Sequence, residues 1–188
     1  MLRKTFAVIV VSVVFMVSGC GGSPALRNPS SSDNSLLYGH LNTATSGTGN
    51  CWLSLREISS GNKGRRYMAE CDEMGYFWAS DIPPGKYYAE KFGNHMKAFN
   101  DEGYMRVIKN MGEFREATKI TIKEPGIYYL GTFRVTTGGS GSFGSGSQKV
   151  IRAERPDEKK VLRRLLQVSK GTDWDERINS RLRSLPGE

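Results

Sequence analysis

Few side chains in this sequence of 188 residues have the type and spacing needed for catalysis or metal binding. Its only histidines, His40 and His95, have no cysteines or carboxylates around them at metal-ligand spacing. No serine or cysteine elbow is present that a histidine would activate as a nucleophile. The carboxylates Asp72, Glu73 and Asp81 lie in predicted turns, where aspartate commonly bonds to the local backbone. The sequence therefore predicts no catalytic residue, no metal site and no enzyme.

A glycine-rich tract offers the one match to a cofactor motif. Gly139-Ser140-Gly141-Ser142-Phe143-Gly144 has the spacing GxGxxG of dinucleotide-binding loops. No helix is predicted to begin on this tract, and in a run of Gly and Ser the match arises easily by chance. The Gly-Lys-Ser/Thr ending of a phosphate-binding P-loop is also absent from it. We therefore expect no cofactor.

The amino terminus has the layout of an export signal. A basic pair, residues 3–4, precedes an uncharged apolar run, 6–17, and the small residues Ser18 and Gly19 then precede Cys20. Twelve residues in a helix rise only about 18 Å, less than the roughly 30 Å hydrocarbon core of a bilayer. The pattern is therefore typical of a secretory signal rather than of a membrane-spanning helix.

The stretch Val17-Ser18-Gly19-Cys20 resembles the lipobox of bacterial lipoproteins. The resemblance implies that residues 1–19 are a signal peptide removed before Cys20, and that acyl chains on Cys20 hold the protein on a membrane. An aspartate after the lipidated cysteine usually retains such proteins in the inner membrane, and Gly21 stands there instead. In an organism with two membranes we therefore expect the outer one, with the domain facing the periplasm. The alternative is an ordinary secretory signal that ends in a cysteine by chance.

The remaining cysteines, Cys51 and Cys71, form an even pair. Exported proteins meet an oxidising environment, so a disulfide between them is one expectation. Two buried free thiols are the other, because the sequence does not show that these side chains face each other.

The charge of the chain favours some partners over others. Without residues 3–4, the chain has 25 basic and 19 acidic residues, a net charge of +6 spread along its length. This excess fits either an evenly solvated surface or contact with lipopolysaccharide, acidic glycans or phospholipid headgroups. We expect no nucleic-acid partner, because no basic-aromatic recognition module is present.

The elements that would position a binding surface are mainly strands. Residues 20–35, rich in Gly, Ser, Pro and Asn, predict a flexible lipidated tether. In residues 36–137, short apolar or aromatic runs alternate with turn residues, which predicts a mainly β domain. Seven strands are expected, near residues 36–41, 51–58, 65–70, 76–79, 86–92, 118–123 and 127–135. Seven short strands favour an antiparallel β-sandwich.

The segment from Gly75 to Tyr88 gives the clearest local signal, with two aromatic runs around Ile82-Pro83-Pro84-Gly85. Pro84 and Gly85 fit the second and third positions of a type II turn, the third of which requires a positive φ. The segment resembles the Pro-Pro-Gly stretch of carboxypeptidase regulatory-like and other transthyretin-like β-sandwiches. The resemblance spans roughly residues 36–135 and implies a seven-stranded transthyretin-like sandwich. Such domains serve as accessory, adhesion or carbohydrate-associated modules without catalytic residues of their own.

The chain after the predicted sandwich changes character twice. Residues 138–149 begin with a Gly/Ser tract and predict a linker or a hairpin tip. Residues 150–188 predict a helical appendage, because apolar residues recur at helical spacing in two stretches. These residues are Val161, Leu162, Leu165, Leu166 and Val168, and then Trp174, Ile178, Leu182 and Leu185. We expect this C-terminal pair of helices to pack together and on the sandwich.

Aromatic residues supply the candidate binding surface. Adjacent aromatic residues on a strand point to opposite faces, so one of each pair should be core and the other partly exposed. Trp78 and Tyr88, with His95 and Tyr104 of a long loop between residues 93 and 112, are the candidate ligand or partner residues. The competing interpretation, which we favour, is that the C-terminal helices cover the aromatic stripe.

Together these patterns predict a lipid-anchored, non-catalytic binding or assembly module of the cell envelope. Its expected contacts are the membrane, through lipid on Cys20, and another envelope protein. The alternative is a glycan-binding accessory domain, or a hydrolase, that acts on envelope polysaccharide.

Overall fold

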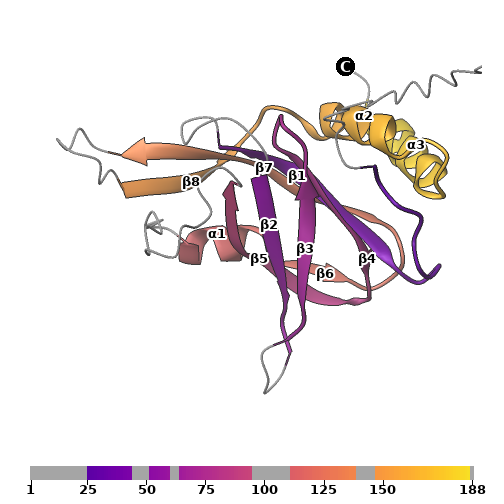
Figure 1. Cartoon of the computed structure of the whole chain (residues 1–188), viewed down its shortest axis with the longest axis horizontal. Coiled ribbons are helices and arrows are strands. Elements are labelled where there is room, and N and C mark those ends of the chain that lie inside the picture. The colour runs from indigo at the N-terminus through magenta and orange to yellow at the C-terminus, as the bar shows by residue number, and fades with distance from the viewer. Residues whose placement is uncertain (1–24, 44–50, 60–63, 95–110, 139–146, 187–188) are drawn as a thin grey trace, which may run out of the picture.

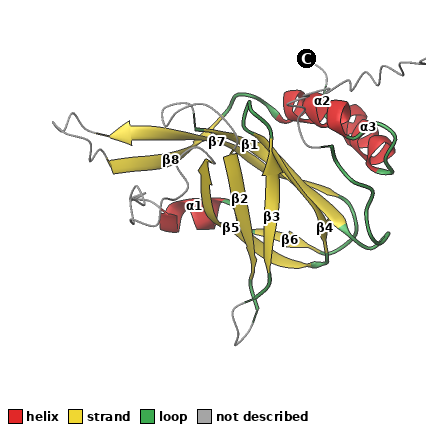
Figure 2. Cartoon of the chain, viewed as in Figure 1, coloured by secondary structure: helices red, strands yellow, loops and turns green. Residues whose placement is uncertain are grey.

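The computed structural model describes residues 25–43, 51–59, 64–94, 111–138 and 147–186. Within these residues the fold is mainly β, one curled eight-stranded sheet with three helices (Figures 1 and 2). The strands are β1 (Ser35–Asn42), β2 (Cys51–Glu57), β3 (Arg66–Cys71), β4 (Tyr76–Ile82), β5 (Gly85–Asn94), β6 (Ile120–Ile122), β7 (Ile127–Gly138) and β8 (Ser147–Ala153). The helices are α1 (Met111–Ala117), α2 (Glu158–Val168) and α3 (Trp174–Ser184). No helix of the described residues is long and apolar enough to cross a membrane.

The sheet has the strand order β6-β5-β2-β3-β4-β1-β7-β8. The seven expected strands are all present, but the prediction of seven antiparallel strands needs two corrections. An eighth strand, β8, pairs with β7 over residues expected to be linker and helical appendage. β1 and β7 run parallel. Their direction could not be predicted because no local turn joins strands so far apart in the sequence.

Strand β1 lies at the centre of the fold because both of its faces are buried. Leu37 and Leu41 point into the core enclosed by the curled sheet, whereas Leu36 and Tyr38 point outward into a second core. All four side chains are fully buried. The inner core is closed by α1, whose Phe114 contacts Phe133 of β7 edge to face. The period-two alternation of a strand thus supplies both cores of the protein.

The parallel pair β1 and β7 approaches closely at two glycines. A Cβ on Gly39 would lie 2.5 Å from the carbonyl oxygen of Gly131 and from the ring of Phe77. The register shifts at this point, and Gly131 adopts a φ of 121°. Glycine is required here because a side chain at residue 39 has no room, and the backbone at residue 131 disfavours any other residue.

Helices α2 and α3 pack against each other and cover the outer side of β1, β4 and β7 (Figure 1). Helix α2 begins at Asp157, whose carboxylate accepts a hydrogen bond from the Lys160 amide at 2.8 Å. Each helix turns its apolar stripe to the sheet, namely Val161, Leu162 and Leu165 from α2 and Trp174 and Ile178 from α3. The favoured interpretation, that these helices cover the aromatic stripe, holds for Trp78 but not for Tyr88, which lies outside the core beneath the helices.

Two local features differ from the expectations. Residues 25–34 fell within the predicted flexible tether, yet Leu26 is only 3% exposed and belongs to the core beneath α2 and α3. Gly85 does not have the positive φ expected of the third position of a type II turn, and the positive φ nearby is that of Asp81, at 60°, within β4 where the register with β1 shifts. The Asp81 carboxylate accepts hydrogen bonds from the Ser30 amide and hydroxyl, so a contact distant in sequence holds this irregular part of β4.

We expect Trp174→Ala to lower the free energy of unfolding by about 3–5 kcal/mol, because a fully buried indole leaves a cavity between the helices and the sheet. Chemical denaturation of the purified protein measures this change. Arg183→Ala, an exposed position on the same helix, is the matched control and should change stability by less than about 0.5 kcal/mol. Equal effects of the two substitutions would contradict the assigned packing of α3.

Candidate functional site

The residues predicted to form a ligand surface do not come together. Trp78 is only 1% exposed beneath α2 and α3, so its expected role as an exposed contact is wrong. Tyr88 of β5 is half-buried and pairs with Arg56 on the side of the sheet that faces away from the inner core. His95 and Tyr104 lie outside the residues that the structure describes.

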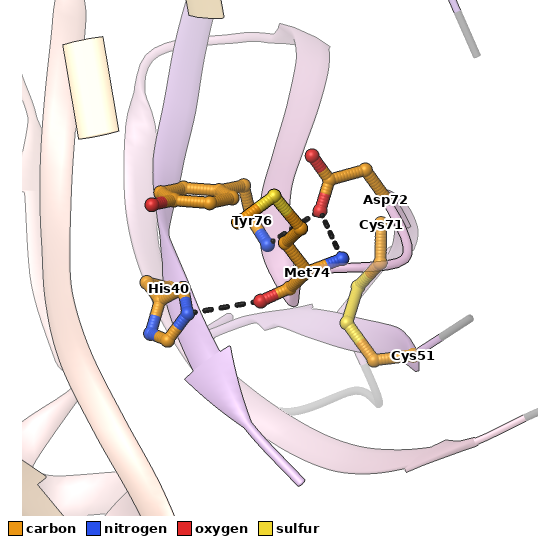
Figure 3. The surroundings of a disulfide bond; sticks show 6 residues. All are labelled: His40, Cys51, Cys71, Asp72, Met74 and Tyr76. Carbon is orange, nitrogen blue, oxygen red and sulfur yellow. Dashed lines mark hydrogen bonds between the residues drawn. A yellow bond between two sulfur atoms is a disulfide. The ribbon is translucent and has the colours of Figure 1, made fainter. Parts of the chain in front are cut away.

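Cys51 and Cys71 form a disulfide between the start of β2 and the end of β3 (Figure 3). Their Cα atoms are 5.3 Å apart, and both residues belong to the inner core. Of the two alternatives left open by the sequence, the structure contains the bridge and not the pair of free thiols. The bond lies directly before the turn formed by residues 72–75 and ties that turn to β2.

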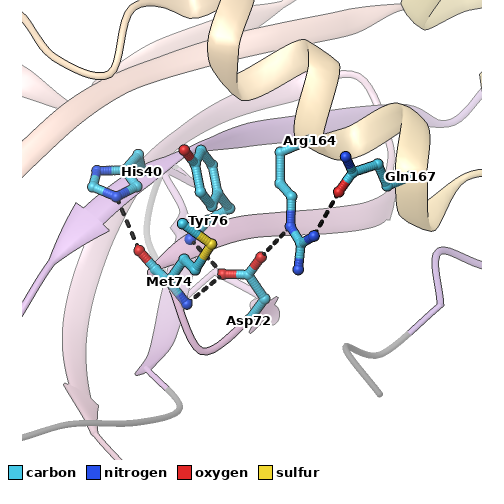
Figure 4. A network of polar contacts seen from close by, with 6 residues as sticks. All are labelled: His40, Asp72, Met74, Tyr76, Arg164 and Gln167. Carbon is cyan, nitrogen blue, oxygen red and sulfur yellow. Dashed lines mark hydrogen bonds and ion pairs between the residues drawn. The ribbon is translucent and has the colours of Figure 1, made fainter.

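Asp72 holds this turn and connects it to helix α2 (Figure 4). One carboxylate oxygen accepts hydrogen bonds from the amides of Met74 and Tyr76, at 2.9 and 3.0 Å. The other accepts from Arg164 Nε of α2 at 2.7 Å, and the Asp72 side chain is fully buried. Arg164 in turn donates to Gln167 at 2.6 Å. A buried carboxylate with three donors is satisfied, so its chemistry here is structural rather than catalytic.

His40 lies on the other side of the same turn. Its Nε2 donates to the Met74 carbonyl oxygen at 3.0 Å, and its ring packs edge to face against Tyr76. Its Nδ1 is buried without a hydrogen-bond partner in the described part of the chain. Burial lowers the pKa of His40, and this effect outweighs the Met74 hydrogen bond and Asp72, which raise it. Lys160 lowers the pKa further. The imidazole is therefore neutral.

A second polar contact fastens the helices to the sheet. The Tyr38 hydroxyl donates to Glu158 of α2 at 2.7 Å, and Arg181 of α3 donates to the same carboxylate at 2.8 Å. Burial, followed by the hydrogen bond to Glu158, raises the pKa of Tyr38 well above its ordinary value. Tyr38 therefore stays protonated and acts as a fixed donor rather than as an acid or base.

The polar groups described on the covered side of the sheet thus hold the fold together. Asp72, His40 and Tyr76 are brought together around the turn that precedes β4 (Figure 4). Among the residues that are described, no group of three His, Cys, Asp or Glu side chains is arranged to hold a metal ion.

Within the described part of the chain, no helix covers the outer surface of β5, β2 and β3, which we call the open face. It is defined by Trp52, Arg56, Arg66, Met68, Tyr88 and Glu90. These side chains alternate along the strands with the core residues Leu53, Leu55 and Ala69, so they lie on the other face of the sheet. The core beneath α2 and α3 draws its strand residues from β1, β4 and β7 and none from β2, β3 or β5. The helix pair therefore covers only part of the outer surface of the sheet.

An ion cluster lies on the open face. Glu90 of β5 accepts from Arg56 at 2.7 Å and from Arg66 at 2.9 Å, and only 12% of its side chain is exposed. Burial alone would raise the pKa of Glu90, but the hydrogen bonds from the two arginines outweigh it and lower that pKa. Arg56 and Arg66 are register partners on β2 and β3, which brings both guanidinium groups to Glu90. Two guanidinium groups around one carboxylate leave an excess of positive charge in this cluster.

Apolar groups border this ion cluster. Met68 of β3 is 56% exposed. The ring of Trp52 lies over Gly93 of β5, since a Cβ on Gly93 would be 2.7 Å from the indole. Trp52 and Tyr88 are both half-buried. The open face therefore combines aromatic rings, a methionine and arginines, the residue types enriched in protein interfaces.

Sequence reasoning missed most of this surface. Trp52 and Met68 belong to the predicted strands 51–58 and 65–70, and alternation with Leu53, Leu55 and Ala69 places them opposite the core. That signal was present in the sequence. The sequence did not indicate which outward-facing residues the helices would cover. That depends on the order of the strands in the sheet.

Comparison of the chain with protein-family models, with curated proteins and with solved structures found no match in any of the three.

We expect the protein to lose stability as the pH falls below about 6.5, because unfolded His40 binds a proton there while the buried imidazole, with its lowered pKa, does not. The contribution is complete above that pH and is lost between it and the folded-state pKa, by at most about 1.4 kcal/mol per pH unit. Chemical denaturation between about pH 7.5 and 5 measures it. His40→Gln is the comparison, because it retains a donor for Met74 but does not titrate. Parallel pH profiles of the two proteins would contradict the neutral, buried state of His40.

Proposed function

We propose that this chain is a lipid-anchored lipoprotein of the cell envelope that serves as a non-catalytic binding or assembly module. The observation that carries the proposal is the stretch Val17-Ser18-Gly19-Cys20, directly after a short apolar segment with a basic start. These residues lie outside the part of the chain that the structure describes. A cysteine at that point, after small residues, is the acceptor for acyl chains in the lipoproteins that this stretch resembles.

The disulfide supports the export that this proposal requires. Disulfides persist in oxidising compartments and are rare in the cytosol. The bond between Cys51 and Cys71 is therefore the arrangement expected of an exported domain. Because Gly21 and not aspartate follows Cys20, we place the protein on the outer membrane, facing the periplasm, in an organism with two membranes.

We also propose that the sheet is related to transthyretin-like domains. The segment that resembles them, Gly75–Tyr88, forms β4, the Pro83-Pro84 turn and the start of β5. Strands β1 to β7 would then be the shared part, with β8, α2 and α3 added at its carboxyl end. Such a relationship favours a binding module, since the resembling domains carry no catalytic residues of their own.

The open face is our candidate for the binding surface, and another protein of the envelope is its proposed occupant. Trp52, Arg56, Met68 and Tyr88 are of the types that contribute most of the binding energy in protein interfaces. Met68 gains the most from being covered, because it exposes 56% of its surface. The partly buried Arg56 is already held in place by Glu90, so little side-chain freedom is lost on binding.

Glycan binding is the second candidate, and one observation favours it. The Trp52 indole lies over Gly93, and an aromatic ring on a strand can stack on a sugar ring. Tyr88 pairs with Arg56, which lies four residues from Trp52 along β2. The positions of the two aromatic residues are therefore about 13 Å apart along the strand direction. Two aromatic rings at that spacing would contact separate sugar units of one polysaccharide chain.

We expect a protein expressed in cells fed an alkyne-tagged fatty acid to carry the tag, and Cys20→Ala to lose it, because the thiol of residue 20 is the proposed acceptor. The tag is detected on the purified protein after mild denaturation. The double variant Cys51→Ala with Cys71→Ala is the matched control and should keep the tag. Tagging of Cys20→Ala at the native level would exclude lipidation at this residue.

We expect crosslinking in intact cells to capture one envelope protein with the native chain, and Met68→Glu to reduce that capture by about tenfold, because a carboxylate would be buried at the centre of the contact. Ile151→Glu, which changes a 37% exposed isoleucine on β8, is the control and should leave capture unchanged. Equal capture by both variants would contradict the assignment of the open face. Loss of sedimentation with purified cell-wall polysaccharide in Trp52→Ala, without loss of protein capture, would select the glycan candidate instead.

A further inference from the structure

The first described residues are fixed against the junction of α2 and α3. The Leu26 amide donates to the Val168 carbonyl oxygen at the end of α2, at 2.9 Å. The Trp174 indole donates to the Arg27 carbonyl oxygen at 2.8 Å, and the Asp173 amide donates to the Asn28 side chain at 2.8 Å. The chain is thus held at both helices, well before β1 begins at Ser35.

This attachment shortens the connection between the domain and Cys20. Only six peptide links separate Cys20 from Leu26, and a fully extended chain gains at most about 3.6 Å per residue. Whatever conformation they adopt, these residues span no more than about 22 Å. A free tether through residue 35 would span about 54 Å instead. A domain of this size is roughly 40 Å across, so the shorter connection limits which side can reach the membrane.

We propose that the junction of α2 and α3, residues 168–174 with Leu26 and Arg27, is the side of the domain that contacts the membrane. This inference rests on the proposed lipidation of Cys20. The occupant is the headgroup layer of the bilayer and not its hydrocarbon core. Arg27, Lys170 and Asp173 are exposed there, whereas the exposed large apolar residues Ile58, Met68, Met74 and Ile151 all lie elsewhere in the described chain.

The arrangement of the fold fixes what this orientation presents to the periplasm. In Figure 1 strands β2 and β3 run away from α2 and α3, and the end of β2 and the start of β3 lie at the far side of the described molecule. Glu57 and Arg66 mark the described ends of β2 and β3 there. The open face therefore extends from the helix pair away from the bilayer, where an envelope partner has access to it.

Fluorescence energy transfer to the membrane tests this orientation. The lipidated protein, reconstituted in vesicles of phosphatidylethanolamine and phosphatidylglycerol with a headgroup-linked acceptor dye, is labelled through a clickable amino acid at Lys170 or at Arg66. We expect a severalfold higher transfer efficiency from residue 170 than from residue 66. An acyl-chain quencher should not reduce the fluorescence at residue 170, because the junction contacts headgroups only.

A longer connection provides the control. Inserting about 30 Gly and Ser residues after Gly22 leaves Leu26 in place and adds roughly 30 Å of mean reach. The difference between the two labelled positions should then largely disappear. Equal transfer from both positions in the protein without the insertion, while it remains bound to vesicles, would overturn the orientation and leave the anchor intact. Failure of the acylated preparation to bind vesicles, or absence of acylation, would overturn the anchor and the orientation together.

Discussion

The rest of the structure depends on the burial of β1 on both faces. Leu37 and Leu41 complete the inner core, and Leu36 and Tyr38 on alternate positions begin the outer one. A central strand buried on both faces needs a layer on each side, because the exposed leucines and tyrosine would otherwise cost about 1.5–3 kcal/mol each. The curl of the sheet provides the inner layer, and α2 and α3 provide the outer one. The helices therefore share a core with the sheet, as expected from the sequence.

The polar contacts of the covered side follow from that requirement. Packing a helix pair on a sheet buries the tyrosine hydroxyl and the turn before β4, and buried polar groups need partners. Glu158 accepts from Tyr38, and Arg164 donates to Asp72, so these two helix-to-sheet contacts each satisfy a group that the packing removed from water. The disulfide before Asp72 fixes the same turn from the side of β2. Of the groups considered for catalysis in the sequence, Asp72 here positions α2 against the sheet, and His40 holds the turn before β4.

Local patterns predicted the elements well and their arrangement poorly. Each of the seven expected strands is present because period-two alternation and turn residues act within a few positions, and the apolar stripes of α2 and α3 are equally local. β8 was missed because Val150 and Ile151 are its only large apolar residues, beside a Gly/Ser tract. Its pairing with β7 supplies what its own composition does not. Contacts between distant segments bury Leu26 and Trp78 and leave Met68 exposed. A pattern of neighbouring residues carries no information on such contacts.

The outer surface of the sheet changes composition where the helix pair ends, and this change supports a role for the open face. Beneath α2 and α3 the outward residues are Leu36, Tyr38 and Trp78, which require cover. On β2 and β5 their places are taken by residues such as Arg56 and Glu90, which form ion pairs and remain stable in water. Met68 and the indole over Gly93 lie beside these ion pairs on the same part of the sheet. Because residues 26–28 are held at the helix pair, the proposed anchor and the proposed binding surface use different parts of the molecule, and neither need obstruct the other.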